Sequence, residues 1–238
     1  NHTLKTLQHE TNKVFWLKKC PVKTIYSLTV MRTYLVIGSN SAVGTAVATR
    51  LRNTGENVIC IDAHGGDVNV DFSIAAGRLE AIEKVLESTG GKVDAIISTT
   101  KTMANKPVAI AINFYGITQF IEGLYDELKK SSSPRISLLN YFETSDKTSP
   151  ELLDAILHTT EKKALKLAQQ ILETTPNLAY QHYTSSQKAL QLWVQEMAVK
   201  RHWKKPGILM NTVTADNSVA VTEIADLLIW LASTANQT

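Results

Sequence analysis

The sequence predicts an α/β protein with one domain, in which helices cover both faces of a doubly wound parallel sheet. Three observations predict this class. Apolar runs of strand length alternate with amphipathic stretches of helix length. The first apolar run ends in a turn rich in small residues, and the second ends in an acidic residue. The length of 238 residues suits a single domain of this class.

The first half of the chain supplies three of the expected strands and two of the helices. An apolar run ends at Gly38, a helical pattern starts near Gly44, and a second apolar run ends at Asp62. A third run, unbroken in its hydrophobicity, is typical of a strand buried on both faces. Strands are therefore expected at 33–37, 57–61 and 93–98, and helices at 43–54 and 76–89, the latter ended by Gly90 and Gly91.

The second half continues the alternation with one addition. A helix is expected at 108–130, Ser131 to Pro134 mark a loop, and the later elements are strands at 135–139 and 207–213 and helices at 183–200 and 222–233. The addition is a helical insertion at 150–174, with Ser149 as its N-cap and a break at Thr159 and Thr160. Its role is either packing and subunit contact or a wall over a substrate cleft.

Charge and composition exclude several kinds of function. The net charge is +3, but residues 1–30 hold five lysines against Glu10, which leaves 20 basic and 21 acidic residues in the rest. A body this neutral makes nucleic acid an improbable partner. No apolar run approaches the roughly 18 residues of a membrane span. Two cysteines, Cys20 and Cys60, form no disulfide framework, and a reducing, cytoplasmic setting is expected.

Residues 1–30 read as an N-terminal extension to the domain at 31–238. The chain starts with Asn1, and Met31 stands directly before the first strand, so Met31 is the expected natural start. The rival interpretation is an arm that contacts a membrane surface or a partner, since residues 14–17 are apolar and lie among lysines.

The first turn and the acid after it predict a dinucleotide site. Glycine permits a tight turn and lets a diphosphate approach the N–H groups at a helix N-terminus. Asp62 follows Gly44 by 18 residues, where an acid can accept hydrogen bonds from an adenosine ribose. Asp62 would repel a 2′-phosphate, and no basic residue follows it closely, so NAD is preferred over NADP. The turn residues expected at the cofactor are Gly38, Ser39, Asn40, Ala42, Val43 and Gly44.

The order of these motifs resembles the short-chain dehydrogenase/reductase family, and within it the bacterial 3α-hydroxysteroid dehydrogenase/carbonyl reductase group. The segments that carry the resemblance are Gly38 to Gly44, Ile61-Asp62, Asp71-Phe72, the turn at Asn113, Asn177 to Tyr180, the insertion at 150–174 and Met210 to Val213. The resemblance implies a Rossmann fold that lacks the family's last strand, an NAD(H)-dependent oxidoreductase acting on a small carbonyl or alcohol, and a homo-oligomer. It also places Asp71 and Phe72 at the adenine, and Thr99 and Thr100 in the loop beside the cofactor.

The resemblance also names the catalytic positions, and the chain departs from the family there. Tyr183 matches the general acid/base, but the lysine expected four residues later is Gln187, and Lys188 comes one residue late, about 140° around the helix. Tyr180 is the alternative for the family tyrosine. Asn140 stands where a serine should bind the reacting oxygen, and its amide can still donate a hydrogen bond.

The remaining positions receive simpler interpretations. Asn113 matches the residue that organises a water relay in the family, and its other interpretation is to satisfy backbone groups. Tyr125 and Lys129 have the tyrosine–lysine spacing but lie on an earlier helix, so they are taken as a coincidence. His182 and His202 are expected at the surface, and no cluster of residues has metal-ligand spacing, so no metal is predicted.

Three functions stay open from the sequence. The first is an active oxidoreductase, for which a missing general-base contribution costs roughly 10²–10⁴ in rate. The second is a dinucleotide-binding protein without catalysis, acting as a sensor, a scaffold or a subunit partner. The third is a decayed gene product. Binding without turnover selects the second, and turnover that depends on Tyr183 selects the first.

Overall fold

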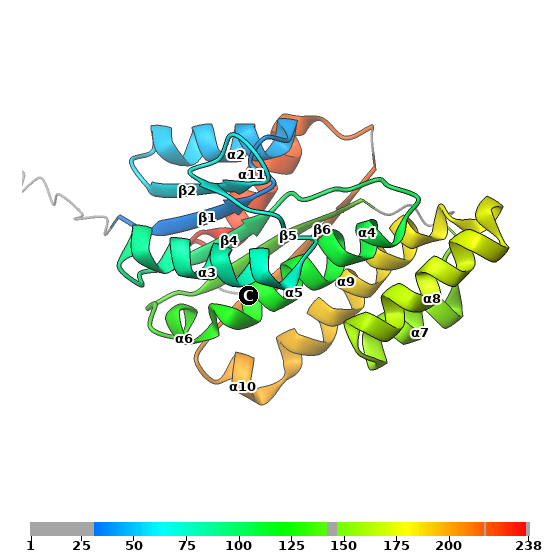
Figure 1. Cartoon of the computed structure of the whole chain (residues 1–238). Coiled ribbons are helices and arrows are strands. Elements are labelled where there is room, and N and C mark those ends of the chain that lie inside the picture. The colour runs from blue at the N-terminus through cyan, green and yellow to red at the C-terminus, as the bar shows by residue number, and fades with distance from the viewer. Residues whose placement is uncertain (1–30, 142–146, 217, 237–238) are drawn as a thin grey trace, which may run out of the picture. The chain divides into compact units, whose positions relative to one another are not determined.

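Six parallel strands form one sheet in the order β3-β2-β1-β4-β5-β6 in the computed structural model, which describes residues 31–141, 147–216 and 218–236 (Figure 1). The expectations for residues 1–30 lie outside this part of the chain. The strands are β1 (Thr33–Ile37), β2 (Asn57–Asp62), β3 (Val68–Asn69), β4 (Ala95–Ser98), β5 (Arg135–Tyr141) and β6 (Leu209–Ala215). The predicted doubly wound parallel sheet is confirmed.

The strand order creates a switch point between β1 and β4. From β1 the chain moves outward through β2 to β3, and it then crosses back to place β4 on the other side of β1. The pairing register sets Ile37 of β1 beside Ser98 of β4, so both strands end at the same level. In sheets of this kind, ligands bind in the crevice outside the carboxyl ends of the strands at this point.

Helices cover both faces of the sheet (Figure 1). On one face, α2 (Ala42–Asn53) and α11 (Val221–Ala232) bury an apolar core that includes Val36, Ile97 and Leu228. On the other face, α3 (Ala75–Thr89), α5 (Ile117–Gly123) and α9 (Gln181–Val199) share a larger core. The shorter elements are α4 (Pro107–Ile110), α6 (Tyr125–Leu128), η2 (Pro176–Leu178) and α10 (Arg201–Lys204).

The expected continuous helix at 108–130 is wrong. The chain instead runs through α4, a π-helical segment η1 (Ala111–Gly116), α5 and α6, with non-helical geometry at Leu124. A π turn adds one residue per turn and often marks a functional segment. The helix bounds expected from apolar periodicity did not separate this segment from the helical turns on either side of it. Asn113 lies in this segment, and its side chain is buried.

The helical insertion is a pair, as the sequence predicts: α7 (Pro150–His158) and α8 (Glu161–Thr174), broken at Thr159 and Thr160. Arg78 of α3 ties this pair to the domain. Its guanidinium, with only 2% of the side chain exposed, donates to both carboxylate oxygens of Glu161 at 2.7 Å. It also donates to the carbonyls of Phe72 and Ala111, so one side chain joins α3, η1 and α8.

Two further expectations need correction. The short strand β3 was not expected, because two residues carry no alternation pattern; Val68 pairs with Ile61 and Asn69 with Asp62. His182 is fully buried, whereas the surface was expected, and its ring nitrogens lie 2.6 and 2.8 Å from the carbonyl oxygens of Ala179 and Ala168. Both of these oxygens are acceptors, so a neutral imidazole donates to one carbonyl and its other ring nitrogen lies against the second. No strand follows α11 in the described residues.

Replacing Arg78 by methionine tests the tie between the insertion and the domain. Arg78→Met leaves a half-buried carboxylate and two carbonyl groups without their donor, so the free energy of unfolding should fall by about 3 kcal/mol. The control is Arg50→Met, which removes an exposed ion pair to Asp226 and should cost less than about 1 kcal/mol. Urea denaturation measures both, and equal losses would contradict the assigned role of Arg78.

Candidate functional site

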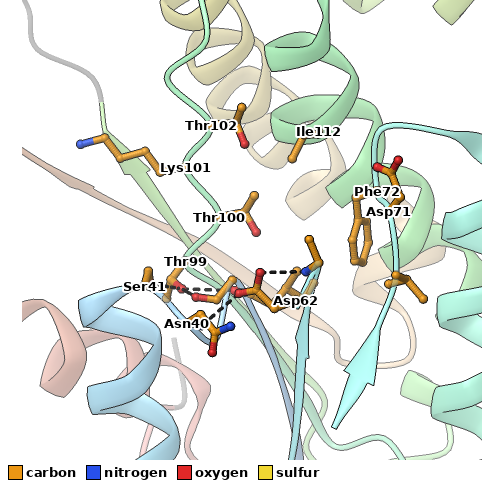
Figure 2. A pocket seen from close by; sticks show the side chains of 14 residues that line it. Asn40, Ser41, Asp62, Asp71, Phe72, Thr99, Thr100, Lys101, Thr102 and Ile112 are labelled. Carbon is orange, nitrogen blue, oxygen red and sulfur yellow. Dashed lines mark hydrogen bonds between the residues drawn. The ribbon is translucent and has the colours of Figure 1, made fainter. Parts of the chain in front are cut away.

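A cleft of about 290 Å³ opens at the switch point of the sheet (Figure 2). Its walls come from the turn after β1, the end of β2, the segment after β3 and the loop after β4. The lining residues are Ile37, Gly38, Asn40, Ser41, Asp62, Ala63, Val70, Asp71, Phe72, Thr99, Thr100, Lys101, Thr102 and Ile112. Six of the expected cofactor residues besides Gly38 are therefore brought together here: Asn40, Asp62, Asp71, Phe72, Thr99 and Thr100.

The turn between β1 and α2 depends on two glycines. Gly38 has φ of 75°, a conformation that favours glycine, and a Cβ there would lie 2.9 Å from the Thr100 nitrogen. A Cβ on Gly44 would lie 2.3 Å from the Gly38 carbonyl oxygen and 2.8 Å from Thr99 Oγ1. The absence of both side chains lets the first turn of α2 pack against the ends of β1 and β4.

Ser41 begins α2 and links the turn to the loop after β4. Its hydroxyl accepts the Gly44 N–H at 2.9 Å, as an N-cap does, and it lies 2.9 Å from Thr99 Oγ1. The Thr99 hydroxyl donates to the Gly38 carbonyl at 2.8 Å. These three hydrogen bonds hold the turn in one geometry. The N-terminus of α2, which favours anions, faces the cleft.

The other turn residues named from the sequence lie in different surroundings. Ala42 is exposed on the first turn of α2, and Val43 is buried in the core beneath it. Ser39 is buried, lines a separate small polar hollow, and its hydroxyl has no hydrogen-bond partner among the described residues. The residues of this turn that line the cleft are Gly38, Asn40 and Ser41.

Asp62 ends β2 with its carboxylate at the cleft. One carboxylate oxygen accepts a hydrogen bond from the Asn40 N–H at 2.9 Å. The other accepts one from the N–H of the next residue, Ala63, at 2.8 Å (Figure 2). Each carboxylate oxygen has a second lone pair, so both can still accept from a ligand hydroxyl. The two backbone contacts hold the carboxylate beside the glycine turn, where a ribose bound over the turn would meet it.

Asp71 and Phe72 form the opposite wall. Hydrogen bonds from the Ser73 hydroxyl and N–H hold the pKa of the Asp71 carboxyl below its usual range, so it is ionised at neutral pH. Phe72 is buried, and its ring packs edge-on against Phe120 with centroids 5.4 Å apart. An apolar ring next to a carboxylate suits a flat, polar-edged group such as a nucleobase.

The loop after β4 is held in place by Asn113. The Asn113 amide accepts the Thr102 N–H at 2.9 Å, donates to the Thr102 carbonyl at 3.0 Å, and donates to Ser186 Oγ at 3.1 Å. Thr100, in the same loop, has a buried hydroxyl with no partner in the described part of the chain. That hydroxyl lies in the lining of the cleft, where a ligand oxygen could pair with it.

The candidate reacting groups do not line the cleft. Tyr183 Oη donates to the Tyr141 carbonyl at 3.1 Å, and Gln187 Oε1 accepts the Tyr141 N–H at 3.0 Å. Asn140 and Gln187 are fully buried, and both amide atoms of Asn140 and Nε2 of Gln187 lack partners among the described residues. Helix α9 is thereby bonded to the end of β5, through the residues that match the family's reacting positions.

The lysines and tyrosines nearby are also placed. Lys188 donates to Gln191 one turn further along α9, at 2.9 Å. Tyr180, the alternative tyrosine, is 37% exposed and precedes α9. Tyr125 donates to the His202 carbonyl of α10 at 2.8 Å and does not line the cleft.

Several residues of the site carry no clear signal in the sequence. Ser41 could have been found, because it directly precedes a helical pattern as N-cap residues do. Thr102 and Ile112 could not be found in this way, because a loop and a π turn bring them to the cleft.

Among the described residues, no three or more His, Cys, Asp or Glu side chains gather to hold a metal. None of the described helices is long and apolar enough to span a membrane.

The Asn113 amide can be tested against a matched exposed amide. Asn113→Ala leaves a buried N–H and a buried carbonyl unpaired, so the free energy of unfolding should fall by about 2–3 kcal/mol. Asn69 bridges the N–H and carbonyl of Gly66 in the same manner but is exposed, so Asn69→Ala should cost less than about 1 kcal/mol. Similar urea midpoints for the two variants would refute the anchoring role of Asn113.

Solved structures share this fold, whereas no protein-family model and no curated sequence matches the chain. A 3α-hydroxysteroid dehydrogenase from Pseudomonas sp. B-0831, complexed with NADH, has a TM-score of 0.77 at 23% identity, over 85% of this chain and 89% of that one.

Two further oxidoreductases of the short-chain family show the same likeness. One from Brucella ovis, in complex with a partially ordered NAD, has a TM-score of 0.62 at 18% identity, over 86% of this chain and 94% of that one. A metagenomic enzyme in complex with NADP has a TM-score of 0.65 at 14% identity, over 87% and 93%. The neighbours are short-chain dehydrogenases/reductases, and the resemblance predicted from the sequence is confirmed at the level of the fold.

Proposed function

We propose that the chain binds NAD(H) in the cleft at the switch point and acts as an oxidoreductase on a small carbonyl or alcohol. The observation that carries the proposal is the joint placement of the Gly38 turn, the Asp62 carboxylate and the Asp71-Phe72 wall around one cleft. In this arrangement the adenine lies against Phe72, the ribose hydroxyls meet Asp62, and the diphosphate lies over the turn. Similar folds that hold NADH, NAD and NADP support a nicotinamide dinucleotide.

The cleft fits this group on its own chemistry. A Cβ at Gly38 or Gly44 would collide with neighbouring backbone. Without side chains at these two positions, a diphosphate could approach the backbone of the turn. The unpartnered Thr100 hydroxyl adds a hydrogen-bonding group in the lining. A volume of about 290 Å³ is at the small end for ligand sites, which suits the nucleoside half of a dinucleotide.

The choice of NAD over NADP follows from Asp62. A carboxylate at the ribose accepts hydrogen bonds from both hydroxyls but repels a 2′-phosphate. No lysine or arginine among the cleft residues lies on the β2 side to offset this repulsion. NAD(H) is therefore the proposed cofactor.

We expect NADH to bind at least about tenfold more tightly than NADPH, which corresponds to 1.4 kcal/mol. Asp62→Ala should narrow that ratio, because it removes both the attraction for the hydroxyls and the repulsion of the phosphate. Asp226→Ala, an exposed acid on α11, is the control and should leave the ratio unchanged. Fluorescence titration gives the affinities; equal affinities for both cofactors in the unmodified protein would count against the assignment.

The proposed chemistry places named groups at the reacting end. Bound NADH would supply the hydride for reduction of a carbonyl. Tyr183 is the proposed proton donor, which requires its hydroxyl to leave the Tyr141 carbonyl for the substrate oxygen. Asn140 Nδ2 and Gln187 Nε2 are proposed amide donors to that oxygen, since both nitrogens lack acceptors in the described chain; both side chains are fully buried and would have to become accessible to the substrate. Asn113 positions the loop between the two halves of the site.

A second candidate is NAD(H) binding without turnover, in a sensor, scaffold or partner subunit. One observation favours it: Tyr183 and Gln187 both bond the backbone of Tyr141, and Gln187 and Asn140 are fully buried. Side chains that hold a helix to a strand in this way have a structural role already. Catalysis would require them to give up those bonds.

Tyr183→Phe separates the two candidates. If the chain is an oxidoreductase, this change should lower turnover of a responsive ketone by about 10²-fold or more while NADH affinity stays within about twofold. Tyr180→Phe is the matched variant and should leave turnover unchanged. If Tyr180→Phe lowers turnover and Tyr183→Phe does not, Tyr180 is the family tyrosine instead. NADH binding without turnover of any ketone in a broad panel selects the second candidate. A protein that binds no NADH contradicts both.

A further inference from the structure

Two apolar residues of the cleft lining come from segments that are far apart in the chain. Phe72 lies in the segment between β3 and α3, and Ile112 lies in η1 (Figure 2). The part of the cleft that these two side chains line is called the base slot here, because the proposed function places the adenine against it. The affinity of a flat base for such a slot depends on the width of the slot, since a gap of about 0.5–1 Å already loses much of the dispersion attraction.

Arg78 of α3 donates hydrogen bonds to the backbone on both sides of the base slot. Its Nε donates to the Phe72 carbonyl at 2.8 Å, and its Nη2 donates to the carbonyl of Ala111, the residue before Ile112, at 3.2 Å. The guanidinium is planar and rigid, so its N–H groups keep fixed positions relative to one another. These two hydrogen bonds therefore restrain the separation between the Phe72 segment and η1.

Apolar packing restrains the base slot from the other direction. A Cβ on Gly116, at the end of η1, would lie 3.1 Å from Phe72 Cβ, and the Phe72 ring packs edge-on against Phe120 of α5. These contacts limit how closely η1 and α5 approach the Phe72 segment. The hydrogen bonds of Arg78 limit how far the segments move apart, so the two sets of contacts together fix the width.

The helical insertion supplies the counter-charge of Arg78. Glu161, the first residue of α8, accepts hydrogen bonds from Nη1 and Nη2 of Arg78 at 2.7 Å each, and Gln119 Oε1 accepts one from Nη1 at 2.9 Å. The Arg78 side chain is only 2% exposed, and a guanidinium this buried is costly without an ionic partner. Removing the Glu161 carboxylate would therefore destabilise the position from which Arg78 reaches the two carbonyls.

We propose that Arg78 is a positioning residue for the adenine half of the cofactor, and that Glu161 of the helical insertion holds Arg78 in place. This inference rests on the proposed function. The insertion then controls how tightly the dinucleotide binds, a role distinct from subunit contact and from a wall over the substrate. Arg78 acts through the backbone at Phe72 and Ala111, because Arg78 itself does not line the cleft.

The test compares AMP and NADH, which share the adenosine half, on folded protein. Titration calorimetry gives the AMP affinity, fluorescence gives the NADH affinity, and circular dichroism checks folding at the titration temperature. Glu161→Gln removes the charge and keeps the side-chain size, and it should weaken both ligands by at least about fivefold. Arg78→Lys keeps the charge but cannot bond both carbonyls and the carboxylate in the same geometry, so it should weaken both ligands at least as much.

A matched variant separates positioning from a loss of stability. The Ser149 hydroxyl caps α7 by accepting the Leu152 N–H at 3.2 Å, so Ser149→Ala weakens the insertion without touching Arg78. This variant should leave both affinities within about twofold of the unmodified protein. The double variant of Arg78→Lys and Glu161→Gln should bind no more weakly than the weaker single variant, because both changes remove the same interaction.

The outcomes distinguish failure of this inference from failure of the proposed function. If the unmodified protein binds AMP and NADH, and folded Glu161→Gln and Arg78→Lys bind both within about twofold, the role of Arg78 is refuted and NAD(H) binding stands. A loss for NADH alone would also refute it, because the defect would then lie outside the adenosine half. An equal loss in Ser149→Ala would refute it as well, because the contact between Glu161 and Arg78 would then have no specific part. An unmodified protein that binds neither ligand defeats the proposed function, and the inference with it.

Discussion

The close approach of the first turn of α2 to the ends of β1 and β4 is the constraint on which the rest of the site depends. It requires hydrogen in place of a side chain at Gly44, because a Cβ would lie 2.3 Å from the Gly38 carbonyl oxygen. It also requires the positive φ of Gly38. With both satisfied, Ser41 and Thr99 bond across the gap, and the backbone of Asn40 reaches the Asp62 carboxylate. The cleft is what remains between these pieces and the Asp71-Phe72 wall.

The two ends of the site have different characters. At the end proposed for adenosine, side chains are held in place by the backbone and still present acceptor lone pairs or an apolar surface to the cleft. At the end proposed for the reaction, Tyr183 and Gln187 bond the backbone of Tyr141, and Asn140 is fully buried. Under the proposed function, the first end is ready to bind, whereas the second must rearrange before it can react. Lys101 lines the cleft, and its ammonium lies over the ring of Tyr141 at the end of β5.

Local features of the sequence predicted the fold and several of the residues that line the cleft. The strand, glycine turn, helix, strand and acid between Thr33 and Asp62 form a contiguous unit, so spacing alone places their groups. The break between α7 and α8 at Thr159 and Thr160 was predicted correctly. The surface position expected for His182 was wrong. A polar residue on a helix can face either solvent or a buried carbonyl; for His182 the contact with Ala168 of α8 decides. The Arg78 contact with Glu161 and the contact of Lys101 with the Tyr141 ring depend on residues far apart in the chain, so no spacing rule reveals them.

The most direct measurement of the central claim is a crystal structure of the protein grown with NAD⁺. The account predicts density for the diphosphate over the turn between Gly38 and Gly44, with the adenosine ribose hydroxyls within hydrogen-bonding distance of the Asp62 carboxylate. A dinucleotide bound elsewhere, or a cleft closed by side chains at saturating NAD⁺, would contradict it.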